Sequence, residues 1–143
     1  MMTTPQENAA LVRRFLSDVV AGGDTAAVDV FLTEDATVHN LGFGETHGQE
    51  ALSALGWRVL AGSNVDVDIE DVVATEDRVA VRATVSGMHR GSLMDLAPTG
   101  RSFEIPYTWF CRIVHRQITE IWSLPDGLSL MQQLGAVPET IPN

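Results

Sequence analysis

Asp126 is the side chain in this sequence whose setting best fits proton-transfer chemistry. It follows a segment that carries Trp122 and Leu124, and it precedes a short apolar segment closed by Gly135. A carboxylate that faces an apolar cavity loses hydration, which disfavours its ionised form and suits it to taking and returning protons. The alternative is that Asp126 caps the segment beginning at Gly127, because Asp oxygens commonly accept backbone N–H bonds at helix starts. Spacing alone favours the cap.

Two histidines are candidates for donating a hydrogen bond to a substrate oxygen. His89 continues the inward-facing register of the strand from Val79 to Gly87, and His39 ends an earlier strand. For each, the alternative is a structural histidine, which for His89 would be bonded to the loop 91–100. No two histidines have metal-ligand spacing, so we predict no metal site.

Aromatic side chains could form the walls of a substrate site. Tyr107, Trp109 and Trp122 fall in strand patterns, and aromatic rings stack on planar ligands. Trp57 falls in a helical pattern and could roof the cavity or pack beneath the sheet. The alternative for all of them is ordinary core packing.

The charge of the chain excludes several functions. Its formal net charge is −10, and every basic residue apart from histidine is Arg. Such a surface repels phosphate backbones and anionic membranes, so we expect no nucleic-acid or membrane partner. The absence of Lys excludes Schiff-base catalysis. Cys111 lies alone in an apolar pattern and is expected to be core, and no phosphate-loop motif is present, so we predict no cofactor.

The length of 143 residues predicts one domain over residues 1–143, with 136–143 as a loose tail. Apolar runs are too short for a membrane helix, and the first residues lack the features of a signal peptide. We therefore expect a soluble, cytoplasmic protein.

Two kinds of periodicity divide the chain into helices and strands. Helical spacing begins at the capping-box pattern Thr4–Glu7 and predicts a first helix that ends at Gly22–Gly23. The same spacing predicts a second helix from Asp24 to Leu32 and a third over 49–60. A brief strand is predicted at 36–39. Strand alternation covers 65–70, 79–87 and 103–113, with turns at 76–77 and 115–116. This order predicts an α+β fold, in which a cone-shaped, curved antiparallel sheet is covered by N-terminal helices around a small-molecule cavity.

The ordered motifs of the chain resemble those of SnoaL-like polyketide cyclases, in the ketosteroid isomerase and nuclear transport factor 2-like superfamily. The motifs are Glu120-x-Trp122-x-x-x-Asp126 ending in Gln133-Leu134-Gly135, Gly87–Gly91 with Pro98–Gly100, and Asp35–His39. The resemblance spans roughly the first helix to Gly135. It implies that Asp126 is the catalytic acid/base of a cofactor-free intramolecular aldol cyclisation of a polyketide-like substrate.

Other functions fit the same scaffold, because one fold hosts many activities. An isomerase or hydrolase that uses Asp126 is one alternative, and a non-catalytic small-ligand-binding or dimerisation module is another. An enzyme is expected to hold Asp126 in a cavity, whereas a binding module would leave it exposed or capping a helix. We also expect a homodimer or homotetramer formed through an outer sheet face that carries Arg82, Thr84, Thr108 and Phe110.

Overall fold

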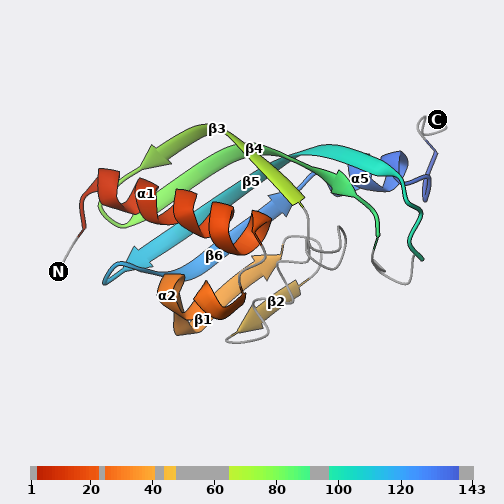
Figure 1. The fold of residues 1–143 in the computed structure, drawn as a ribbon. Coiled ribbons are helices and arrows are strands. Elements are labelled where there is room, and N and C mark those ends of the chain that lie inside the picture. Colours follow the sequence, from red (N-terminus) through yellow and green to blue (C-terminus); the bar gives the residue numbers. More distant parts are fainter. Residues whose placement is uncertain (1–2, 23–24, 41–43, 48–64, 91–96, 139–143) are drawn as a thin grey trace.

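The computed structural model describes residues 3–22, 25–40, 44–47, 65–90 and 97–138 (Figure 1). The predicted helix over 49–60, with Trp57 on it, lies outside the described residues, as does most of the expected tail.

The first helical segment, formed by α1 and a π-helical extension, begins and ends where the sequence predicts. α1 spans Pro5–Phe15, and its capping box is formed: the Thr4 hydroxyl accepts from the Glu7 N–H, and the Glu7 carboxylate accepts from the Thr4 N–H, both at 3.1 Å. The bond from the Thr4 backbone N–H is the main cause that holds the pKa of the exposed Glu7 carboxyl below its usual value. The helix continues as a π-helical segment, η1 (Leu16–Ala21), which ends at Gly22.

The remaining described helices are short. A 3₁₀ turn, η2 (Thr25–Ala27), leads into α2 (Val28–Phe31), and α5 (Gly127–Gln133) follows the last strand. Leu32, expected at the end of the second helix, instead begins the first strand. None of the helices described is long and apolar enough to cross a membrane.

Six strands form one mixed sheet in the order β2-β1-β6-β5-β4-β3. The strands are β1 (Leu32–Asn40), β2 (Gly44–His47), β3 (Val65–Ala74), β4 (Arg78–Met88), β5 (Ser102–Val114) and β6 (Gln117–Pro125). Antiparallel pairing from β3 to β6 agrees with the prediction, and the hairpin turns lie at the predicted positions. The difference is β1, which pairs parallel with β6, so the sheet is not wholly antiparallel.

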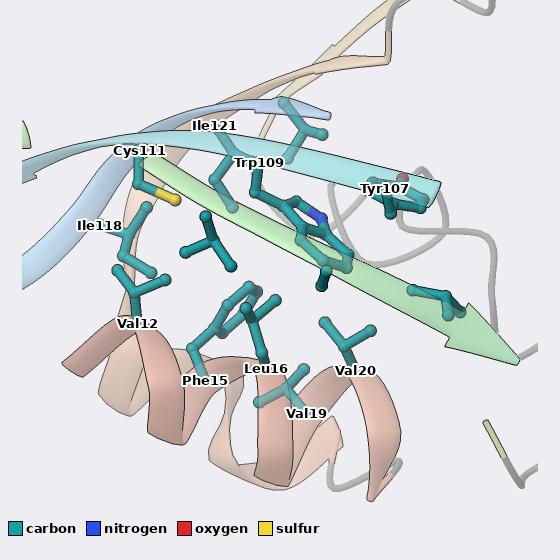
Figure 2. Packing of buried hydrophobic residues seen from close by; sticks show 14 of the residues in the cluster. Val12, Phe15, Leu16, Val19, Val20, Tyr107, Trp109, Cys111, Ile118 and Ile121 are labelled. Carbon is teal, nitrogen blue, oxygen red and sulfur yellow. The ribbon is translucent and has the colours of Figure 1, made fainter. Parts of the chain in front are cut away.

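Helix α1 and its extension η1 lie across one face of the sheet, here called the inner face, and the opposite face is called the outer face (Figure 1). Along β5 burial alternates strictly, and every second residue from Phe103 to Ile113 is buried. Figure 2 shows these inward side chains packed against one side of α1 and η1, where Val12, Phe15, Leu16 and Val20 lie. Burial of these apolar side chains fixes the parity of β5 and thus decides which residues can reach an inner-face site.

Candidate functional site

Asp126 lies at the junction between β6 and α5 and caps the helix. Its Oδ1 accepts the Ser129 N–H at 3.0 Å, and its own N–H donates to the Pro106 carbonyl on β5 at 3.1 Å. The side chain is exposed, so the expectation of a buried carboxylate is wrong. The capping geometry predicted as the alternative is present, and the catalytic role stays a prediction.

The position of α5 is fixed from both ends, which also fixes Asp126. The Gln133 side chain accepts from the Glu104 N–H at 2.7 Å and donates to the Glu104 carbonyl at 2.9 Å. Gly135 ends the helix with φ +81°, and its N–H donates to Gln132 while Ala136 N–H donates to Met131. This pair of bonds is a Schellman motif, which favours Gly at the left-handed position.

His89 is fully buried just beyond β4, and its ring has a defined tautomer. The Thr99 backbone N–H donates to Nδ1 at 3.1 Å, and the Thr99 hydroxyl lies 3.0 Å from the same nitrogen. Because Nδ1 accepts, the proton of the neutral ring is on Nε2. Nε2 has no hydrogen-bond partner among the residues described. The expected bond to the loop 91–100 is therefore present, and it leaves a buried N–H donor.

His39 and Trp122 lie on the outer face of the sheet. The two rings stack at 5.0 Å between centroids, and His39 Nε2 lies 2.6 Å from a Glu120 carboxylate oxygen. Trp122 also meets the exposed Phe110 edge to face. The expectation that Trp122 lines the inner cavity is wrong, because Ile121 and Ser123 are the buried residues of this part of β6 and place Trp122 on the opposite side.

Tyr107 and Trp109 lie on the inner face, as strand parity predicts. Their rings stack on each other with centroids 4.0 Å apart and planes 18° apart, and both side chains are buried. The Tyr107 hydroxyl is hydrogen-bonded to the Ser123 hydroxyl on β6. Ser123 was missed by sequence reasoning, although its position two residues after the buried Ile121 gives it the same inward parity.

Trp109 has a second notable property: the buried indole N–H has no acceptor among the described residues. In the same part of the chain, no group of three His, Cys, Asp or Glu side chains is close enough together to hold a metal ion. The described inner face carries neutral hydrogen-bonding groups on Trp109, Tyr107, Ser123 and His89.

A curved mixed sheet with helix across one face is the α+β fold of the nuclear transport factor 2-like class. The chain belongs to the SnoaL-like polyketide cyclase family, which it matches over residues 10–134. No protein with a curated description matches the sequence.

Solved structures share this fold over nearly the whole chain. A protein from Jannaschia sp. CCS1, assigned as a SnoaL-like polyketide cyclase, has 20% identity and a TM-score of 0.82, covering 94% of this chain and 95% of its own. IdmH from Streptomyces antibioticus, assigned as a polyketide cyclase, has 25% identity and a TM-score of 0.73, covering 93% and 99%. An epoxide hydrolase from M. tuberculosis has 20% identity and a TM-score of 0.69, covering 92% of each chain.

Proposed function

We propose that this protein closes a ring by an intramolecular aldol reaction on a hydrophobic, carbonyl-bearing small molecule of polyketide type. Asp126 removes a proton beside one carbonyl, and the resulting enolate carbon attacks a second carbonyl to form the C–C bond. The alkoxide formed at that second carbonyl takes up a proton, which Asp126 returns. The reaction needs no metal or organic cofactor and takes place in the cytoplasm. Family membership is the observation that carries this proposal.

The geometry of Asp126 is compatible with the acid/base role despite its exposure. The cap occupies only Oδ1, and Oδ2 has no hydrogen bond within the described chain, so one oxygen is available to a substrate proton. A proton flanked by two carbonyl groups is acidic enough for a solvated carboxylate to remove it. Positioning then supplies much of the acceleration, because capping and the bond to Pro106 hold the carboxylate in place.

His89 is the proposed donor to an oxygen that gains negative charge. Its tautomer is set by Thr99, so Nε2–H is a neutral donor on a fully buried side chain. Preorganised donors of this kind stabilise a developing oxyanion because they need not reorient during reaction.

The alternatives keep specific support. An exposed carboxylate that caps a helix is also what a non-catalytic ligand-binding module would show. A hydrolase or isomerase would use the same carboxylate, and a structural neighbour is an epoxide hydrolase.

Proton abstraction can be tested without the natural substrate, by following deuterium exchange at the acidic C1 position of 2-tetralone by NMR. We expect the wild-type protein to accelerate exchange, and Asp126→Asn to reduce that acceleration by a factor on the order of 10²–10⁴. Asp126→Ala should be equally inactive. Asn caps a helix as well as Asp, whereas Ala costs roughly 1 kcal/mol of stability, so the Asn variant separates catalysis from capping.

Asp68→Asn is the matched control, because Asp68 is an exposed carboxylate on β3 far along the sheet order from β6. This variant should accelerate deuterium exchange at C1 of 2-tetralone as much as the wild-type protein does. If Asp126→Asn also keeps the wild-type rate, the acid/base role is rejected and only the cap remains.

We further propose that the protein forms a homodimer through the outer face of the sheet. A cross-strand row there runs through Val73, Ala80, Phe110, Trp122 and His39. Arg82, Arg78 and Arg112 flank this row together with Glu70, Asp71 and Glu120, so the charges beside the row are balanced although the chain is strongly acidic. A second copy related by a two-fold axis would meet such a face with complementary charges.

A further inference from the structure

Two buried N–H donors lack acceptors among the residues described, Trp109 Nε1 and His89 Nε2. Leaving a buried donor unpaired costs roughly 1–3 kcal/mol, so native proteins seldom keep one without a reason. His89 belongs to the mechanism proposed above. The indole N–H of Trp109 has no part in it, and a fully buried tryptophan usually finds a partner for this group.

The surroundings of Trp109 show which edge of the ring is available. One face is stacked against Tyr107, so the ring is not open on that side to a planar ligand. Figure 2 shows the indole lying between the sheet and the side chains of Leu16 and Val20, with its nitrogen edge turned away from α1. The indole therefore offers an N–H donor at its edge rather than a stacking surface.

Ser123 supplies a second polar group directly beside Trp109. The two residues are partners across the β5–β6 ladder, and both have 0% exposure. The Ser123 hydroxyl is bonded to the Tyr107 hydroxyl, and when Tyr107 is the donor of that bond, the Ser123 proton is directed elsewhere. The Trp109 N–H and the Ser123 O–H are thus donors at paired positions of the neighbouring strands β5 and β6, on the inner face.

The chemistry of these donors selects the ligand group. Trp109 Nε1 only donates, so its partner must carry an acceptor such as a carbonyl or enolate oxygen. The buried inner-face residues around it are apolar, and none of the buried side chains described is an Arg that could balance a carboxylate or phosphate. Burying an unpaired anion there would be costly, whereas a ketone oxygen gains a hydrogen bond.

We propose that Trp109 Nε1–H and the Ser123 hydroxyl form a subsite for a ketone oxygen of the substrate that takes no part in the bond-forming step. This inference rests on the proposed function, because a polyketide-type substrate carries carbonyl groups besides the two that react.

The spacing along β6 shows which oxygen this is. Ser123 and Asp126 are three residues apart, which is roughly 10 Å along an extended strand. The oxygens that gain charge in an aldol closure lie beside the carbon whose proton Asp126 removes, so the oxygen held at Trp109 belongs to another carbonyl group. The subsite thereby selects substrates with a further carbonyl away from the ring closure.

NMR of the indole N–H groups tests the subsite directly. The chain has three tryptophans, and Trp109→Phe identifies the Trp109 signal by its loss. We expect 2-tetralone to move this signal downfield, as a new hydrogen bond does, whereas tetralin, which has the same rings and no carbonyl, should not. Trp109→Phe should weaken 2-tetralone binding about five- to tenfold, the value of one typical hydrogen bond, and leave tetralin binding unchanged. Ser123→Ala should weaken 2-tetralone binding in the same direction.

Two control variants separate this inference from the proposed function. Trp122→Phe changes a tryptophan on the opposite face, and it should keep wild-type 2-tetralone affinity. Asp126→Asn should keep the Trp109 shift even where deuterium exchange is lost, so a failed acid/base role leaves the subsite intact. A Trp109 signal that 2-tetralone does not move up to its solubility limit, or that tetralin moves equally, overturns the subsite.

Discussion

Burial determines how reactive the Cys111 thiol is. It lies on the inner face of β5 at 1% exposure, and burial raises the pKa of the thiol to about 12 from an ordinary value of 9.0. We expect no reaction with an aromatic disulfide reagent at about pH 8 in the native state, because the thiolate is the nucleophile. Unfolding in urea should restore rapid reaction, measured by absorbance.

The same shift has a consequence for stability at alkaline pH. A group whose folded pKa is raised contributes stability that is complete below its unfolded pKa, here about 9, and is lost as the pH rises toward 12. Cys111→Ala should therefore lose less stability than the wild type over this interval. A native thiol that reacts at once near pH 8 would contradict both expectations.

Residue type and parity predicted some site residues and misplaced others. Tyr107, Trp109 and His89 lie on the inner face because strand alternation in β4 and β5 is regular. Strand parity on β6 predicts Trp122 inward, yet its neighbours Ile121 and Ser123 take the buried positions, so the parity is the reverse. Ser123 was missed because a lone serine carries no hydrophobic signal, and the exposure of Asp126 depends on chain packing that local sequence does not encode.

The β5–β6 hairpin turn stores backbone strain that the sequence does not relieve. His115 and Arg116 both have positive φ, 50° and 64°, which side chains with a Cβ adopt at a cost. Paired positive values of this kind favour Asn-Gly in a two-residue hairpin turn. We expect the double change His115→Asn and Arg116→Gly to raise the free energy of unfolding by about 1 kcal/mol, measured by urea denaturation.

The ion pair that this change removes should matter little. Arg116 lies 3.8 Å from Glu7 with both side chains exposed, a setting in which ion pairs contribute little. Arg116→Ala is the control, because it removes the ion pair and keeps a Cβ at the strained position. A double variant less stable than this control would show that the turn is not strained.

Among the elements, the parallel pairing of β1 with β6 could not be predicted from the sequence. Hairpin turns at 76–77 and 115–116 bring neighbouring strands together, so β3 to β6 follow from local turn signals. β1 lies more than seventy residues from β6, as the His39 to Glu120 contact shows with a separation of 81 residues. Long-range pairing of this kind is decided by the whole packed sheet rather than by local propensity.

At the scale of the whole molecule, the exposed outer face gives the proposed dimer a sharp test. Leu124 on β6 is 50% exposed beside Trp122, and Leu128 on α5 is 51% exposed but is not part of the sheet. Leu124→Glu would place a charge in a desolvated interface, so we expect it to convert a dimer to a monomer without unfolding the chain. Leu128→Glu adds the same charge at matched exposure and should leave the mass unchanged. Light scattering after size-exclusion chromatography measures the mass of the wild type and of both variants. A wild-type mass equal to one chain would show that copies do not meet through this face. Dissociation by Leu128→Glu but not by Leu124→Glu would show the same.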